Sequence, residues 1–300
     1  MAKRNSLEYV LITPTRNEAA FIEMTIQSVI SQTVIPVKWI IVSDGSTDGT
    51  DDIVKHYMMQ YEWIELVQMP PRQERHFAGK AYAFNRGYGV IKDLSYDIIG
   101  NLDSDVSFEP DFFEFLLIKF FNNPKLGIAG TRFIENGIQT YDYHFSSIEH
   151  VSGQCQLFRR ECFEEIGGYI PVKGGGIDVI AVLTARMNGW LTRAYTEKHF
   201  LHHRTMGTEG QNRWVAKFRD GKKDYTLGSH PLWEICRVTY QATRRPYILG
   251  ALVLFLGYSW CAICRMERPI SKELIKFRRK DQMHRLRKFF ANIFIFNIRK

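Results

Sequence analysis

Cysteine is scarce in this chain, and its positions form no pattern. Only five of the 300 residues are cysteine, at positions 155, 162, 236, 261 and 264. An odd, unevenly spaced set excludes a disulfide framework and indicates no zinc site, so we expect a reducing compartment. Cys261 and Cys264 form a C-x-x-C pair, but they lie inside an apolar run, where core packing explains them better.

The chain also lacks a secretory signal and the common nucleotide-binding fingerprints. The first apolar stretch, 9–12, ends at Thr13 and Pro14 and is too short for a signal peptide. The letters TPTRNE follow the first expected strand in place of G-x-G-x-x-G, and no G-x-x-x-x-G-K-[ST] follows any strand. We therefore expect a cytoplasmic protein that is neither a nicotinamide-dependent dehydrogenase nor a P-loop enzyme.

Positive charge is concentrated at one end of the chain. The formal net charge is +8, and residues 265–300 hold twelve Lys and Arg against three acids, a net of +9 that leaves −1 for the remainder. Binding of nucleic acid needs basic residues around a cleft, so the nearly neutral main body argues against such a partner. The basic stretch instead follows the apolar run 247–264, an arrangement that favours contact with a membrane.

Three placements are open for the run 247–264. As a helix it would extend about 27 Å, barely the thickness of the hydrocarbon core. It can cross the membrane once, lie in the plane of the inner leaflet or dip into it and return, or pack as a core or dimer helix of a soluble protein. We expect the in-plane placement, because a single crossing would deliver the basic tail outside, against the positive-inside tendency. Residues 231–300 are therefore expected to form a helical, membrane-associated region at the cytoplasmic face of the cell membrane.

Short β-branched runs alternate with helical patterns over the first hundred residues. Strands are expected at 9–13, 39–43, 64–67 and 97–102, with helices at 21–30, from about 48, and at about 79–91. Such alternation is typical of a doubly wound α/β fold with a parallel sheet. Because ligands bind beyond the carboxyl ends of such strands, we expect segments 14–18, 44–48 and 103–105 to line one crevice.

An acidic pair, Asp103 and Asp105, follows the strand pattern that ends at Leu102. Two carboxylates one residue apart at the end of a buried strand can hold a hard divalent cation and, through it, a diphosphate. The same triplet also occurs in ordinary acidic turns, so its meaning depends on the surrounding motifs.

Four blocks of sequence carry a resemblance to a known family: "ITPTRNEAAFIEMTIQSVISQT", "WIIVSDGSTDGT", "HFAGKAYAFN" and "GNLDSDV". In their order and spacing, which cover residues 8–106, they resemble the family 2 glycosyltransferases of bacterial and archaeal polysaccharide or glycolipid biosynthesis. The resemblance implies a GT-A fold, that is, a doubly wound, mostly parallel α/β sheet. It also implies a nucleotide-sugar glycosyltransferase domain over 1–230, with 231–300 as a membrane-associated extension.

The resemblance implies roles for particular residues. Those expected to bind the donor, a nucleoside diphosphate sugar such as a UDP- or GDP-sugar, are Pro14, Thr15, Glu18, Asp44, Lys80, Asp103 and Arg204. Asp44 would accept a hydrogen bond from the base, and Lys80 would lie against the diphosphate. The family often has two adjacent acids at the position of Asp44, whereas Ser43 precedes it here. The residues themselves allow an alternative at each place. Segment 44–48 can be a turn in which Asp48 or Thr47 caps the next helix, and Lys80 can be a solvated helix lysine.

The resemblance also implies a metal and a catalytic base. Asp103 and Asp105 would hold Mg²⁺ or Mn²⁺ with a third ligand from His202 or His203, and the pattern does not choose between the two histidines. Asp178 would take the proton of the acceptor hydroxyl, although Ile177 replaces the usual glutamate before it. The alternative for Asp178 is a carboxylate that only favours a helix dipole.

Together these features predict metal-dependent, inverting transfer of a sugar to a lipid-linked or saccharide acceptor. Two alternatives from other classes remain. A nucleotidyltransferase that makes nucleoside diphosphate sugars would normally carry a glycine-rich loop with a basic residue after the first strand, and this chain has none there. A non-catalytic membrane adaptor would have no need for Asp44, Asp103, Asp105 and Asp178 together.

Overall fold

The computed structural model of the protein describes residues 7–71, 78–139, 147–204 and 212–298. The chain divides into two compact units, Met1–Thr205 and Met206–Lys300. The sequence patterns placed a boundary after residue 230, so helix α7 (Arg213–Thr226) falls in the second unit instead of the first. The functional assignment of the two parts stays a prediction.

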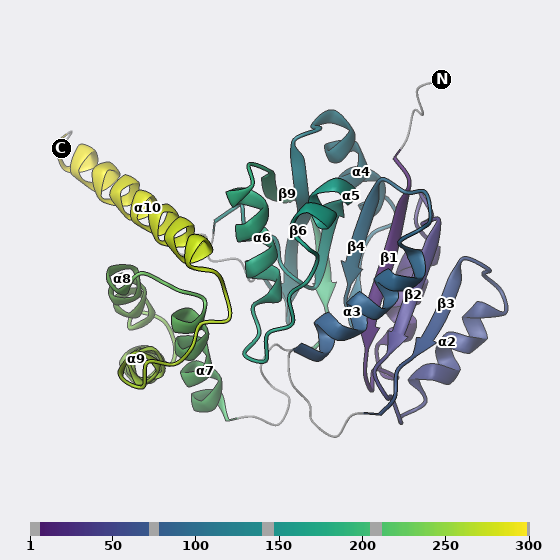
Figure 1. The fold of residues 1–300 in the computed structure, drawn as a ribbon, viewed down its shortest axis with the longest axis horizontal. Coiled ribbons are helices and arrows are strands. Elements are labelled where there is room, and N and C mark those ends of the chain that lie inside the picture. The colour runs from purple at the N-terminus through teal and green to yellow at the C-terminus, as the bar shows by residue number, and fades with distance from the viewer. Residues whose placement is uncertain (1–6, 72–77, 140–146, 205–211, 299–300) are drawn as a thin grey trace. The chain divides into compact units, whose positions relative to one another are not determined.

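Strand and helix alternate through the first half of the first unit (Figure 1). The elements of this unit are β1 (Tyr9–Thr15), α1 (Ile22–Ile30), β2 (Lys38–Ser43), α2 (Thr50–Met58), β3 (Ile64–Gln68), α3 (Ala78–Ile91), β4 (Ile98–Leu102), β5 (Val106–Ser107), α4 (Phe112–Asn122), β6 (Leu126–Glu135), β7 (Ile138–Gln139), β8 (Cys155–Arg159), α5 (Arg160–Glu165), α6 (Ile177–Met187) and β9 (Leu191–His202). The elements expected in the first hundred residues are confirmed, with ends that differ by one or two residues.

The strands form one mixed sheet in the order β3-β2-β1-β4-β8-β6-β9-β5, with β7 paired to β6. The neighbours among β1, β2, β3 and β4 are parallel, as the alternation predicted. Beyond β4 only β6 and β9 are parallel, while β8, β5 and β7 run antiparallel to their partners. The expected mostly parallel sheet is therefore wrong for this half. Parallel neighbours need a long crossover, usually a helix, and none separates β6 from β8 among the described residues.

Helices cover both faces of the sheet (Figure 1). On one face α1, α2 and α4 pack in a core that includes Ile26 and Phe113. On the other face α3, α5 and α6 pack in a core that includes Phe84 and Ala181. The first unit is thus a sheet between two helical layers, which confirms the doubly wound arrangement.

Helix α3 lies close to the sheet because Gly87 has no side chain. A Cβ at this position would lie 2.8 Å from Cγ2 of Ile12, inside ordinary contact distance. The first turn of α3 carries Lys80, whose Nζ contacts Asp103 directly after β4.

The second unit is helical, with α7 followed by α8 (Pro231–Gln241), α9 (Tyr247–Ile263) and α10 (Lys272–Ile298). Helices α7 and α9 touch at two glycines. A Cβ on Gly221 of α7 would meet the Leu254 carbonyl, and one on Gly257 of α9 would meet the Phe218 carbonyl. Within the described ranges, none of the helices combines the length and the apolar character that crossing a membrane requires.

Ionisable side chains are buried between the helices of the second unit. Asp224 of α7 forms ion pairs with Arg237 of α8 and Arg278 of α10. Glu234 of α8 is only 1% exposed, and neither of its carboxylate oxygens has a hydrogen-bond partner in the part of the chain that the structure describes. Burial raises the pKa of Glu234 to about 7, although the charge of Arg278 opposes the rise.

We predict that Glu234→Gln stabilises the protein above pH 7. The folded-state pKa lies above the ordinary value of 4.5, so the stability linked to this proton is complete below pH 4.5 and is lost as the pH rises through about 7. The variant should gain up to about 3 kcal/mol in free energy of unfolding at pH 8, and little at pH 4.5, in urea titrations.

The matched control for this experiment is Glu267→Gln, at an exposed position of the same unit. The control should leave the free energy of unfolding unchanged at both pH values. If Glu234→Gln changed the free energy of unfolding equally at the two pH values, the change would not come from removal of a buried charge.

Candidate active site

The loops after β1, β2 and β4 meet at one edge of the sheet. β1 and β2 stay in register up to Thr15 and Ser43, and the N–H of Asp44 donates to the Thr15 carbonyl at 2.8 Å. Asp103 directly follows β4, where its N–H donates to the Gln154 carbonyl at 2.8 Å. The three segments expected to line a crevice therefore begin at the same edge.

The end of β1 and β2 holds buried polar groups. Asp44 is 6% exposed, and Nη1 of Arg16 lies 3.9 Å from its Oδ2. The hydroxyl of Thr15 is buried without a hydrogen-bond partner among the described residues, and Pro14 beside it is half-buried. Buried polar atoms normally have a partner, so this strand end is a candidate place for a polar ligand.

Asp48 has a structural role in the same loop. Its Oδ1 accepts from the N–H of Thr50 at 3.1 Å, at the start of α2, and its Oδ2 accepts from the N–H of Ala19 at 3.0 Å. Asp48 thus holds the turn before α2, as the turn alternative predicted, but the N-cap residue of α2 is Gly49 and not Asp48 or Thr47. Asp44 faces Arg16 instead, so the turn and a ligand site can coexist in one loop.

Lys80 joins the acidic pair to the loop before β8. Its Nζ contacts Oδ1 of Asp103 and donates to the carbonyl of Gly153 at 2.8 Å. Asn101 donates to the same carbonyl at 2.5 Å. Lys80 is therefore held by partners and is not the solvated helix lysine that the sequence allowed.

Asp105 faces two cationic side chains, each of which has a second acidic partner. Its Oδ2 lies 3.4 Å from Nε2 of His202 and 3.7 Å from Nε of Arg204. Nη2 of Arg204 also donates to Oε2 of Glu18 at 2.6 Å. Nδ1 of His202 lies 2.9 Å from Oε2 of Glu135. The structure thus brings together residues that lie far apart in the chain, up to the 186 positions that separate Glu18 from Arg204.

The contacts of their rings separate the two candidate histidines. Nε2 of His202 lies 3.4 Å from Oδ2 of Asp105, whereas Nε2 of His203 lies 2.7 Å from Oγ of Ser107. His202 is therefore the histidine that faces Asp105, a choice that the sequence left open.

The surrounding charges distinguish the two aspartates. Burial raises the pKa of Asp105, but the hydrogen bond and charge of His202, with the charge of Arg204, outweigh burial and hold this pKa below its ordinary value. Burial raises the pKa of Asp103 despite the charge of Lys80, and the charge of Asp105 adds to the rise. Asp105 is therefore the more readily ionised carboxylate of the pair.

The carboxylates around His202 favour its protonated form. Burial alone would lower its pKa, but the hydrogen bonds and charges of Asp105 and Glu135 raise the pKa above its ordinary value. Protonation of His202 thus balances two carboxylates that lie against it.

The residues at Asp105 fit a divalent cation with two protein ligands. No three His, Cys, Asp or Glu side chains of the described residues form a group that could hold a metal ion. Asp103 contacts Lys80, so the expected set of Asp103, Asp105 and a histidine does not form one group here. Glu135 holds Nδ1 of His202 and leaves Nε2 toward Asp105, as a carboxylate behind a ligating histidine does. Two such ligands suit Mg²⁺ or Mn²⁺ when substrate phosphates supply the others.

Asp178 lies in the first turn of α6, where a carboxylate favours the helix dipole. Its Oδ2 is 4.0 Å from Nε2 of His150. Gly153 packs against it, because a Cβ on Gly153 would lie only 2.9 Å from the Cβ of Asp178. Since Gly153 also accepts from Lys80, Asp178 is linked to the acidic pair through this one glycine.

Sequence patterns did not point to Glu135, His150 or Gly153. Glu135 ends β6 opposite His202, but locally it looks like any polar residue at a strand end. His150 and Gly153 lie in a loop without a recognisable motif. Only Gly153 carried a general signal, because glycine is the residue that permits close approach of another segment.

The chain is similar to known proteins over the part that carries this site. The model of the family described as Glycosyl transferase family 2 matches residues 10–172. The poly-beta-1,6-N-acetyl-D-glucosamine synthases of Staphylococcus epidermidis and of Staphylococcus aureus (strain N315) are each 28% identical over 170 residues. Each match covers 50% of this chain and 39% of the relative, so the chain matches well under half the length of these relatives.

Two solved structures share the fold. The mannosyltransferase PcManGT from Pyrobaculum calidifontis, in complex with GDP-Man and Mn²⁺, has a TM-score of 0.58 at 17% identity and covers 95% of this chain and 76% of its own. Residues 1–349 of TarS from S. aureus, in complex with UDP-GlcNAc, have a TM-score of 0.56 at 14% identity and cover 72% of this chain and 65% of their own. These likenesses show that the fold is GT-A-like.

We predict that Gly153→Ala impairs turnover more than donor binding. The added Cβ would meet Asp178 and displace it, while the carbonyl that accepts from Lys80 is retained. In initial-rate assays of sugar transfer, kcat should fall about ten- to a hundredfold, the scale expected when a side chain of the site is misplaced. The KM for the donor should stay roughly unchanged.

Gly89→Ala is the matched control, because a Cβ on Gly89 of α3 meets nothing within 4 Å. This variant should leave both constants unchanged. A rise in KM alone for Gly153→Ala would place Gly153 at the donor and would contradict its assignment to Asp178.

Proposed function

The chain belongs to glycosyl transferase family 2, and we propose that it transfers a sugar from a nucleoside diphosphate sugar to a saccharide or lipid-linked acceptor during assembly of a polysaccharide or glycolipid. Membership of this family makes the chain a glycosyltransferase. The observation that carries the finer proposal is the grouping of Asp103, Asp105, Lys80, His202 and Arg204. These are the charges that binding of a diphosphate, with or without a cation, requires.

The family assignment decides between the classes that the sequence left open. It contradicts the nucleotidyltransferase alternative, and it makes the chain an enzyme instead of a non-catalytic adaptor.

We infer that the donor is a UDP-sugar, with UDP-N-acetylglucosamine as the first candidate. The curated relatives are named for a polymer of N-acetylglucosamine, and TarS holds UDP-GlcNAc. GDP-mannose is the competing donor, because PcManGT holds GDP-Man. In this chain Asp44 with Pro14 and Thr15 would receive the base. Lys80 and Arg204 would pair with the diphosphate.

Glu18 would orient the arginine that binds the donor. Its carboxylate accepts from Nη2 of Arg204 at 2.6 Å, and its own N–H donates to Oγ1 of Thr50 at 2.8 Å. A guanidinium held on one edge keeps its remaining N–H groups for phosphate oxygens, to which it can donate two parallel hydrogen bonds.

Mg²⁺ or Mn²⁺ would be held by Asp105 and His202, with Asp103 next to them. The neighbour PcManGT contains Mn²⁺, which supports a divalent cation in this fold. When bound, the cation would neutralise negative charge on the departing diphosphate. Its binding needs the neutral form of His202, so it would compete with the proton that Asp105 and Glu135 stabilise there.

Asp178 is the proposed base of a single inverting displacement. The acceptor hydroxyl oxygen forms a bond to the anomeric carbon as the bond to the diphosphate breaks, and its proton passes to the carboxylate of Asp178. Attack opposite the leaving group inverts the configuration of that carbon. His150, 4.0 Å from this carboxylate, would keep it oriented toward the acceptor.

The proposed place of action is the cytoplasmic face of the cell membrane. The net charge of +9 over residues 265–300 supports this location, because anionic lipid headgroups attract polybasic segments. A lipid-linked acceptor would be presented at the same surface.

We predict that two aspartate variants separate metal binding from base catalysis. Asp105→Ala should remove the metal-dependent thermal shift caused by UDP-N-acetylglucosamine or GDP-mannose. Asp178→Asn should leave that shift nearly intact and lower the release of nucleoside diphosphate about a hundredfold or more. Asp93→Asn, at an exposed position of the first unit, is the control and should behave like the wild type.

Each part of the proposal has its own contrary outcome. Full turnover by Asp178→Asn would show that Asp178 is not the base. Undiminished turnover in the presence of EDTA would show that transfer does not require a divalent cation. If neither donor causes a thermal shift in the presence of Mn²⁺, both candidate donors are rejected.

A further inference from the structure

Helix α9 is apolar on all sides, yet only part of its surface is covered. The covered side contacts α7 and α8 and consists of Gly250, Ala251, Leu254, Gly257, Tyr258 and Cys261. The large apolar side chains of the other side are between 40% and 77% exposed, namely Ile248, Leu249, Leu252, Phe255, Leu256, Trp260 and Ile263. At 3.6 residues per turn these seven positions fall on one continuous strip. We call it the exposed strip.

The exposed strip has no charged residue within it. Residues 247–263 contain no Asp, Glu, Lys or Arg, whereas arginines stand at both ends, at positions 244, 245, 265 and 268. A water-soluble surface seldom carries a contiguous apolar area of this kind without a binding role. A helix with apolar side chains along its length and cationic side chains at both ends suits a position in the plane of a bilayer interface.

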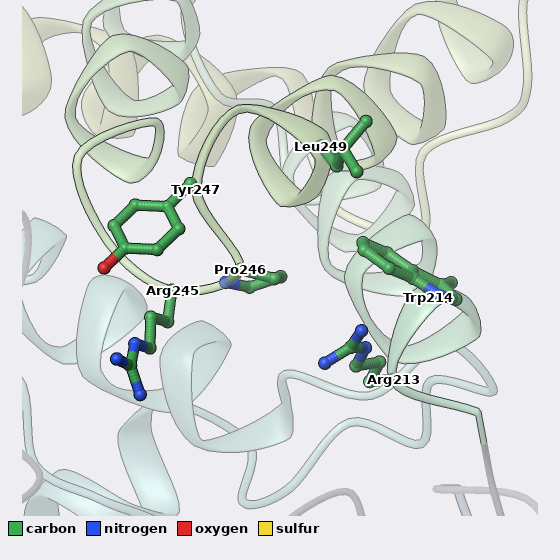
Figure 2. A pocket seen from close by; sticks show the side chains of 6 residues that line it. All are labelled: Arg213, Trp214, Arg245, Pro246, Tyr247 and Leu249. Atoms are coloured by element: carbon green, nitrogen blue, oxygen red, sulfur yellow. The ribbon is translucent and has the colours of Figure 1, made fainter.

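A pocket of about 430 Å³ opens beside the start of the exposed strip (Figure 2). It is lined by Arg213, Trp214, Arg245, Pro246, Tyr247 and Leu249. Leu249 also belongs to the exposed strip, so the pocket and the strip are continuous. In the view of Figure 2 the two guanidinium groups lie on one side of Pro246 and Leu249 lies on the other.

The pocket carries positive charge from three sources. Arg213 is the first residue of α7, and its guanidinium carbon lies 4.6 Å from the centroid of the Trp214 ring. Neither Arg213 nor Arg245 pairs with a carboxylate of any described residue. The N-terminus of α7, capped by Asn212, adds the positive end of its dipole. These charges face an apolar wall formed by Trp214, Pro246 and Leu249.

We propose that this pocket binds the phosphate group of an anionic membrane lipid while the exposed strip lies in the interfacial layer of the bilayer. Two guanidinium groups and a helix N-terminus match a phosphate in charge and in hydrogen-bond donors. The apolar wall receives the hydrocarbon part of the same molecule, which a free anion lacks. The inference deepens the proposed membrane location and rests on it, but it does not depend on the donor or on the chemistry of transfer.

Vesicle flotation of the full chain tests the pocket. The wild type should float with vesicles of phosphatidylcholine that contain about a third phosphatidylglycerol. Arg213→Gln with Arg245→Gln should weaken that binding about tenfold or more, since each cation near an anionic surface contributes about 1 kcal/mol. The matched control is Arg86→Gln with Lys92→Gln, which removes two charges from exposed positions in α3 and directly after it and should bind like the wild type. Equal binding by the two double variants would overturn the pocket assignment.

A second pair of variants tests the exposed strip. Leu252→Ser with Leu256→Ser removes apolar area and should weaken flotation with both anionic and pure phosphatidylcholine vesicles. Inorganic phosphate at constant ionic strength should not displace the wild type from anionic vesicles. Displacement by phosphate would make the pocket a site for a free anion. If the wild type forms a dimer and does not bind vesicles, and the two serine substitutions convert the dimer to monomers, the strip is a contact between two copies. Either result would overturn the proposal.

The variants of the pocket and strip should keep the wild-type rate of transfer to a soluble saccharide acceptor without vesicles. Loss of flotation with retained transfer therefore supports the lipid site separately from the proposed chemistry. If the wild type floats and its flotation depends on the two arginines, but the protein transfers no sugar, the lipid site is supported and the proposed transfer is rejected.

Discussion

The parallel pairing of β1 with β2 and β4 is the constraint on which the candidate site depends. Strands that run in the same direction end at the same edge, so the segments that follow Thr15, Ser43 and Leu102 must begin there together. The later strand β9 pairs with β5 and adds His202 and, directly after the strand, Arg204 to the same edge.

Opposite charges alternate through the site, and this alternation is what makes so many buried ionisable groups tolerable. Asp103 is balanced by Lys80, and Asp105 by His202 and Arg204. A carboxylate buried without such a partner would shift its pKa and become neutral. For the proposed reaction, a diphosphate would use the same cations and a metal ion the same carboxylates. The site would therefore exchange one balanced set of charges for another.

The second unit reverses the usual distribution of charge and apolar surface. It buries the ion pairs of Asp224 with Arg237 and Arg278, and it exposes the strip along α9. Long charged side chains are seldom buried unless paired. The close contact of α7 with α9 at Gly221 and Gly257 decides which side of α9 is covered. A helix with apolar residues all round cannot specify that side by its own pattern.

From the sequence alone we could predict the early strands and helices and the polar segments at their ends, because periods of 2 and 3.6 residues are local properties. The motifs also pointed to Asp44, Asp103, Asp105 and Asp178 as candidate site residues, and their roles stay predictions. The antiparallel half of the sheet was not predictable in this way, because strand direction and register depend on pairing between distant segments. Only the folded chain shows that His202 faces Asp105 and that Glu135 and Gly153 join the site, because contacts between segments far apart in the sequence bring these residues together.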